Sequence, residues 1–150
     1  MNQAHNNTSQ YSQGKPRRRK TNIVLWILQA LLAAAYLMAG YQKALLPLDV
    51  ASVTITWIPD VPPPLVRFIG ISELLGALGL ILPRVTGIGR QLTTLAAAGL
   101  AVVMASATVF HIARGEFFVL PMTLTFFVLL AFVAYGRWKL APFASKGNAG

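Results

Sequence analysis

One carboxylate inside an apolar stretch is the first residue whose position suggests chemistry. Glu73 lies eight residues beyond Leu65, where a run with few other charged side chains begins. At 1.5 Å per residue of helix, this spacing puts the carboxyl group about 12 Å along the element. A carboxyl group at that depth in a membrane is costly unless it is paired, protonated or hydrated. We therefore predict that Glu73 points into the protein, toward a partner.

Two other polar side chains could provide that partner. Lys43 and His111 each lie near the end of another apolar stretch. If they meet Glu73, the three side chains could bind a small ligand, such as a quinone head group, or pass protons. The alternative is structural, with a Glu73–Lys43 or Glu73–His111 contact that only fixes helix packing. Further residues that could line a ligand site are Tyr36, Tyr41, Gln42 and Ser72.

Small residues surround Glu73 in the sequence. Gly70 and Ala77 share its face of a helix, and Gly76 lies beside that face. Small side chains let a second helix approach closely in a membrane. We predict that Gly70, Gly76 and Ala77 are helix-packing positions.

The residue types exclude several classes of active site. The chain has no cysteine, which excludes disulfides, thiolate metal sites and thiol redox relays. It has two histidines, and one of them, His5, lies in the polar N-terminal stretch, so a zinc or haem site is not expected. None of the phosphate-binding, zinc-protease or serine-hydrolase motifs occurs. We predict no catalytic residue and no metal ligand.

The elements that must position these side chains are long apolar helices. Of the 150 residues, 55% are hydrophobic and 11% are charged, whereas soluble domains carry roughly 25% charged residues. Four apolar stretches each match the thickness of a bilayer's hydrocarbon core. The predicted fold class is all-α, an integral membrane four-helix bundle with an interfacial segment between helices 1 and 2. The predicted spans are 23–43, 65–82, 92–112 and 117–135.

The remaining segments complete the predicted organisation. Residues 1–20 are expected to form a disordered basic tail, residues 21–140 the transmembrane domain, and residues 141–150 a short cytoplasmic tail. Apolar residues recur at helical spacing before the prolines that precede the second span, which favours a short helix lying in the interface. A cleaved secretory signal is the rival interpretation of the first span, with Ala33–Ala35 as its cleavage site. The apolar pattern continues past that site, and three more spans follow.

The distribution of Lys and Arg predicts orientation. The formal net charge is +9. With the N-terminus in the cytoplasm, ten basic residues fall inside, and Lys43, Arg67 and Arg114 fall outside. We predict that both termini are cytoplasmic. Arg67 and Arg114 are expected to reach toward lipid phosphates, and Glu116 to pair with Arg114 or cap the fourth helix. A nucleic-acid partner is not expected, because the basic residues separate the apolar runs.

Residues 31–135 resemble the DoxX-like family of small bacterial membrane proteins. The first span ends in Gly40-Tyr41-Gln42-Lys43, like the glycine and lysine of that family. In the second span, Gly70 is followed three residues later by Glu73, and then by a run of small residues that ends at Pro83. The third span closes with Met104 to His111, similar to the family's Ala/His ending.

The resemblance implies a multi-pass protein of the bacterial cytoplasmic (inner) membrane. Some relatives are named as subunits of quinone-reducing sulfur oxidoreductases or of membrane complexes that resist oxidative stress. The first hypothesis is therefore an accessory or anchoring subunit of a quinone-linked redox complex, which is not an enzyme by itself. The alternatives are a quinone- or ligand-binding oxidoreductase component using Glu73 and His111, or a small-solute or proton permease that acts as an oligomer. Apart from quinone, no cofactor is expected, and homo-oligomerisation stays open.

Overall fold

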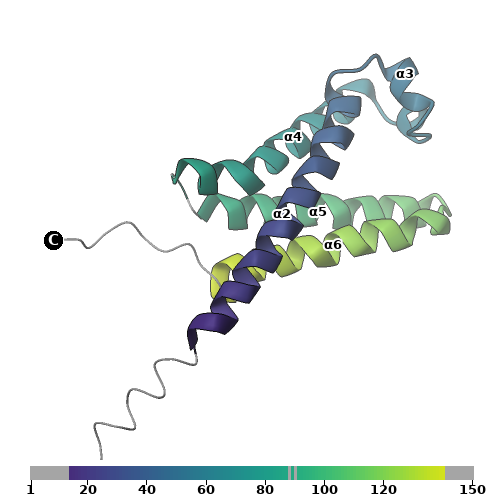
Figure 1. Cartoon of the computed structure of the whole chain (residues 1–150). Coiled ribbons are helices and arrows are strands. Elements are labelled where there is room, and N and C mark those ends of the chain that lie inside the picture. The colour runs from purple at the N-terminus through teal and green to yellow at the C-terminus, as the bar shows by residue number, and fades with distance from the viewer. Residues whose placement is uncertain (1–13, 88, 90, 141–150) are drawn as a thin grey trace, which may run out of the picture.

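The computed structural model describes residues 14–87, 89 and 91–140, and nearly all of these residues are helical (Figure 1). No strand occurs among them, which confirms the predicted all-α class. The elements are α2 (Gly14–Ala44), α3 (Leu48–Ser52), the 3-10 turn η1 (Ile58–Asp60), α4 (Pro63–Thr86), α5 (Gln91–Ala113), the 3-10 turn η2 (Phe117–Val119), α6 (Leu120–Tyr135) and the π-helical turn η3 (Gly136–Leu140).

Four of the described segments are long and apolar enough to cross a membrane, as the sequence predicts. They are Arg19–Ala44, Pro63–Thr86, Gln91–Ala113 and Phe117–Leu140. The last segment combines η2, α6 and η3 into one continuous span. Each is long enough for the hydrocarbon core, since about 20 helical residues cover 30 Å.

Two boundaries differ from the sequence prediction. Helix α2 begins at Gly14, so residues 14–20, which were expected to be disordered, are helical. Lys and Arg favour helix, which lets α2 extend beyond its apolar part. Pro83 was expected to end the second span, but α4 continues to Thr86 and stops at Gly87, whose φ of 74° suits glycine. The rest of the predicted N-terminal tail and the predicted C-terminal tail lie outside the described residues.

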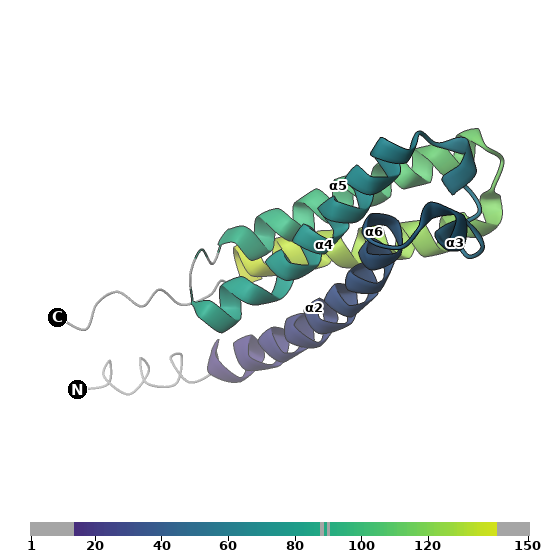
Figure 2. The same cartoon turned by 90° about the horizontal axis from the view of Figure 1, so that it is seen from above.

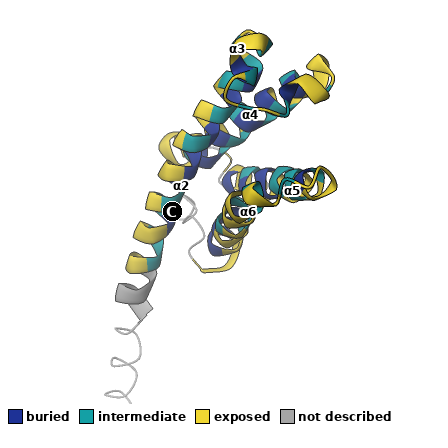
Figure 3. Ribbon diagram, turned by 90° about the vertical axis from the view of Figure 1, so that its right-hand side faces the viewer, coloured by how far each residue is buried: buried dark blue, intermediate teal, exposed yellow. Residues whose placement is uncertain are grey.

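The helices pack as two hairpins. Helix α2 packs mainly on α4, α5 packs mainly on α6, and contacts between α4 and α5 join the two pairs. Figure 3 shows the α2–α4 pair and the α5–α6 pair as separate layers, with buried residues on their facing sides. The short connection between α5 and α6 forces these helices to run antiparallel.

The charged residues divide between the two ends of the bundle. The start of α2, the end of α4 and η3 lie at one end, which carries Arg19, Lys20, Arg84, Arg137 and Lys139, and we call this the basic end (Figure 2). The opposite end holds α3, η1 and the α5–α6 turn, and we call it the α3 end.

Two apolar clusters form the interior. The larger one runs through all four spans, and its members include Leu25, Leu80, Leu100 and Leu130. A smaller cluster of Ala51, Ile58 and Val66 packs α3 and η1 onto the start of α4. The outward faces are also apolar, as expected of helices that meet lipid.

Glycines bring α2 and α4 into backbone contact. A Cβ atom added at Gly70 would lie 2.5 Å from the Ala44 nitrogen, and one added at Gly40 would lie 2.8 Å from the Gly70 oxygen. Of the other predicted packing residues, Gly76 lies against the Leu100 side chain and Ala77 is buried in the larger cluster. Close approach of α2 and α4 therefore requires that Gly40 and Gly70 stay small, whereas Gly76 makes room for Leu100 of α5.

Replacing Gly70 tests this contact. Gly70→Ala should lower the free energy of unfolding by about 1–3 kcal/mol, because the new methyl group meets backbone atoms that cannot rotate away. Gly99→Ala is the matched control, since no atom lies within 4 Å of a Cβ at that helical position. Unfolding in detergent micelles would measure both. Equal stability of the two variants would contradict the contact.

Candidate functional site

A buried ion pair joins α2 and α4. Lys43 Nζ lies 2.8 Å from Glu73 Oε2, and the side chains are only 9% and 3% exposed. Each residue follows, by one helical turn, a glycine of the backbone contact, since Gly40 precedes Lys43 and Gly70 precedes Glu73. The glycines thus set the spacing at which the two side chains meet. Of the two structural partners proposed for Glu73, the structure pairs it with the lysine.

The surroundings of the pair contain one polar atom with spare hydrogen-bonding capacity. Glu73 Oε2 is occupied by the Lys43 ammonium group at 2.8 Å. The hydroxyl of Tyr36, buried two turns before Lys43, has no partner among the described residues. The Tyr36 ring packs edge-on against Phe126, with ring centroids 5.7 Å apart. Buried polar atoms normally find partners, so the Tyr36 hydroxyl is the atom here that could bind a small polar molecule.

His111 has a different partner from the one expected. Its Nδ1 lies 2.6 Å from Glu116 Oε2, so the structure brings together two of the three predicted side chains, Lys43 and Glu73, and commits His111 to another network. The reason is local. Gly115, with a φ of 71°, turns the chain so that the Glu116 amide donates to the His111 carbonyl and its carboxylate reaches the ring.

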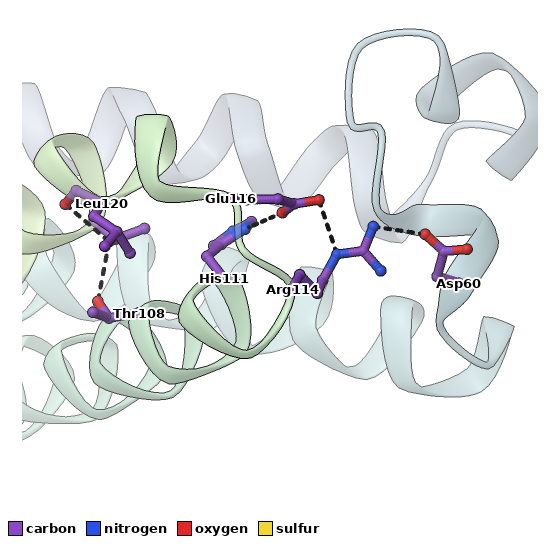
Figure 4. Close-up of polar contacts among 7 residues, drawn as sticks. Asp60, Thr108, His111, Arg114, Glu116 and Leu120 are labelled. Atoms are coloured by element: carbon purple, nitrogen blue, oxygen red, sulfur yellow. Dashed lines mark hydrogen bonds and ion pairs between the residues drawn. The ribbon is translucent and has the colours of Figure 1, made fainter.

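Arg114 extends this network to the segment before α4. Its Nε donates to Glu116 Oε1 at 2.9 Å, and its Nη2 donates to Asp60 Oδ2 at 2.8 Å (Figure 4). The predicted Arg114–Glu116 pair is thus confirmed. Phe110 lies under the guanidinium and packs edge-on against Trp57, with centroids 5.9 Å apart. These contacts, which we call the α3-end lock (Trp57, Asp60, Phe110, His111, Arg114, Glu116), hold η1 against the α5–α6 turn.

The lock shifts the titration of its own members. The pKa of Glu116 lies below its usual range, because His111 and then Arg114 hydrogen-bond the charged carboxylate. The pKa of Arg114 is raised by its hydrogen bonds to Glu116 and then Asp60. Both groups are therefore more firmly charged in the folded protein than in an unfolded chain.

The other predicted site residues are less closely involved with the ion pair. Tyr41 is exposed, Gln42 is half-buried, and the Ser72 hydroxyl donates to the Phe68 carbonyl of its own helix at 2.8 Å. Arg67, which was expected to reach lipid phosphate, instead donates to the carbonyl groups of Lys43 and Leu46 at the end of α2. Among predicted lining residues, Tyr36 is the one that is buried on the same helix face as Lys43.

Sequence reasoning missed a second buried polar cluster, at the basic end. Arg137 Nε donates to Gln29 Oε1 and its Nη1 donates to Asn22 Oδ1, both at 2.6 Å. Gln29 Nε2 in turn donates to the Leu80 carbonyl at 2.6 Å. A signal was present, because Asn22 and Gln29 are polar residues seven positions apart and so share one face of an apolar helix. The partner, from 108 residues away in the chain, was not predictable.

No group of three His, Asp or Glu side chains in the described part of the chain could hold a metal ion. The buried ion pair, the α3-end lock and the Arg137 cluster are instead three separate polar contacts between helices. Each joins elements distant in sequence, and each contains at least one ionised side chain.

Comparison with known proteins identifies one family. The family model described as the DoxX-like family matches residues 27–133, well over half of the chain. No curated protein and no solved structure matches the chain. The matched range contains the Lys43–Glu73 pair and the α3-end lock, but it ends before Arg137.

Removing one member of the ion pair should be more damaging than removing both. Lys43→Met or Glu73→Leu alone would leave an uncompensated buried charge and should cost about 3–5 kcal/mol of unfolding free energy. The double variant should recover most of this loss, because neither charge remains. Unfolding in detergent would be measured for all three variants, with exposed Lys20→Met as the control. If Glu73→Leu alone proved as stable as the parent protein, the ion pair would not be what holds α2 against α4.

Acid should release the α3-end lock. The folded-state pKa of Glu116 is lowered, so its contribution to stability is present above its unfolded pKa, about 4.3, and is lost as pH falls through the lower folded value. Trp57 emission should therefore change on the acid side of about pH 4, measured in a Trp26→Phe/Trp138→Phe background. Glu116→Gln should show a weaker change. The same pH profile in both proteins would rule out Glu116 as the titrating group.

Proposed function

Because the chain belongs to the DoxX-like family, we propose that this multi-pass membrane protein is a non-catalytic accessory or anchoring subunit of a quinone-linked redox complex. In this role it supplies a folded helical platform within the bilayer, and a partner subunit supplies the redox chemistry. The resemblance to subunits of such complexes motivates the assignment to a redox system.

The observation that carries this proposal is the use of the charged side chains in and near the spans. Glu73 is bound to Lys43, and Glu116 and Asp60 are both bound to Arg114. Such contacts hold helices in register. These ion pairs support a role in which the charged groups stabilise the fold and do not take part in catalysis.

The exposed face of α5 is a suitable docking surface. Ala98, Gly99, Ala105 and Ser106 are all exposed and small, and a Cβ at Gly99 would meet no atom within 4 Å. In lipid, helices associate through close packing and not through the hydrophobic effect, so small exposed residues favour a helix–helix contact. We propose that a transmembrane helix of the partner subunit packs on this face, the α5 docking face (Ala98, Gly99, Ala105, Ser106).

We also propose an orientation and a location. Basic residues of α2, α4 and η3 gather at the basic end, whereas Asp49, Asp60 and Glu116 belong to segments of the α3 end. The positive-inside rule then favours cytoplasmic positions for both termini in a bacterial inner membrane.

A second candidate function rests on one specific observation. The buried Tyr36 hydroxyl has hydrogen-bonding capacity that the described residues leave unused. A quinone head group or a proton-carrying water chain next to the Lys43–Glu73 pair would use such an atom. This candidate involves Tyr36, Lys43 and Glu73, because His111 belongs to the α3-end lock. A permease function has no comparable observation in its favour.

Native mass spectrometry of the protein released from its own membrane tests the proposal. We expect a partner chain at fixed stoichiometry. Gly99→Ile should abolish that association while leaving the fold intact, because the larger side chain blocks close approach. Val128→Ile, at an exposed position of α6, is the matched control.

The same spectra separate the two candidates. A protein that appears alone, with quinone bound in the parent form and lost in Glu73→Gln but kept in Ser72→Ala, would overturn the subunit proposal in favour of the ligand site.

A further inference from the structure

The basic end contains a guanidinium group that the fold holds in a fixed position. Arg137 is 3% exposed although it lies within the last turn of the fourth span. The π-helical turn η3 carries it, and Gly136 lets this turn approach Leu25 of α2 closely. Hydrogen bonds to Gln29 and Asn22 then orient the guanidinium plane. π-Helical turns are rare and are frequent at functional sites.

A second guanidinium group shares the same aromatic side chain. The Arg84 Cζ lies 5.8 Å from the centroid of the Trp26 ring, and the Arg137 Cζ lies 5.9 Å from it. Arg84 is exposed at the end of α4. Two cations on one indole create a strongly positive local potential.

The two amide side chains that bind Arg137 orient its guanidinium group. Asn22 and Gln29 accept hydrogen bonds from Arg137, and both side chains are uncharged. The side-chain carboxylates of the protein belong to other regions, since Glu73 binds Lys43 and Asp60 and Glu116 bind Arg114. Asp49 lies in α3, at the opposite end. All four side-chain carboxylates thus lie away from the basic end, and the charged side chains described there are basic.

We propose that the exposed Arg84, beside Trp26 and the buried positive charge of Arg137, binds the phosphate of an anionic phospholipid. Arg presents a planar fork of donors that matches phosphate oxygens, and pockets of basic residues beside spans bind anionic head groups. Both guanidinium groups lie in the last turns of membrane spans, at the level where head groups are found.

The adjacent apolar surface favours a lipid over free phosphate. Ile23 lies one turn before Trp26 and Val85 lies next to Arg84, and these side chains are 51% and 71% exposed. Acyl chains of a lipid whose phosphate is bound at Arg84 can cover such residues, whereas an inorganic ion cannot. The site is separate from the Lys43–Glu73 pair and does not depend on the proposed function.

Lipid titration of the purified, delipidated protein in detergent tests the site. Phosphatidylglycerol binding would be followed by native mass spectrometry and by thermal stabilisation, with phosphatidylcholine as the zwitterionic reference. Arg84→Gln should weaken phosphatidylglycerol binding about tenfold, which corresponds to one charge-assisted hydrogen bond. Lys139→Gln also removes one positive charge from the basic end, but Lys139 does not lie over the Trp26 ring. It should therefore change phosphatidylglycerol binding less than about twofold.

A second variant and a comparison with inorganic phosphate complete the test. Arg137→Gln should also weaken binding, because it removes the second positive charge beside Trp26. If the Arg137 variant does not fold, the Arg84→Gln variant still tests the site, because Arg84 is exposed. Phosphatidylglycerol binding equal in Arg84→Gln and parent protein, or equal losses in Arg84→Gln and Lys139→Gln, would overturn the proposal. If millimolar inorganic phosphate raised the thermal stability of the protein as much as phosphatidylglycerol does, the assignment to lipid would be overturned.

Discussion

The contact between α2 and α4 is the constraint on which the rest of the structure depends. Glycines bring the two backbones together, and the buried Lys43–Glu73 pair lies one turn beyond them. In hydrocarbon, neither charge is tolerable without the other, so separating the helices exposes two charges to lipid at once. Backbone packing and the ion pair therefore require α2 and α4 to cross at the same point.

Two further polar contacts fix the ends of the bundle. At the α3 end, Arg114 connects η1 to the α5–α6 turn, and at the basic end, Arg137 connects η3 to α2. The apolar faces alone would allow the α2–α4 and α5–α6 hairpins to slide, because lipid and protein side chains are equally apolar. Directional hydrogen bonds at both ends remove that freedom. The acidic side chains pair with basic ones at the α3 end, and the charged side chains described at the basic end are basic. The basic end is therefore the better candidate for binding an anionic lipid.

The candidate site was predictable only in part. Glu73 stood out because a carboxylate within a span requires a partner, and Lys43 was one of the two structural partners considered. From the sequence alone, His111 is an equally suitable partner. Its commitment to Glu116 depends on the conformation of Gly115, which reverses the chain within five residues. Arg137 was interpreted as a flanking charge that sets orientation, since its burial depends on the approach of η3 to α2.

Composition and hydropathy alone determined the helical class and the four spans, because a bilayer requires every backbone group in it to be hydrogen-bonded within a helix. That requirement acts on each stretch separately and can be evaluated along the chain. Which polar side chains meet is a different kind of question. Lys43 with Glu73, and Gln29 with Arg137, are 30 and 108 residues apart, and their meeting depends on helix rotation and close approach. Those quantities exist only once the helices are packed, so the tertiary structure alone decided them.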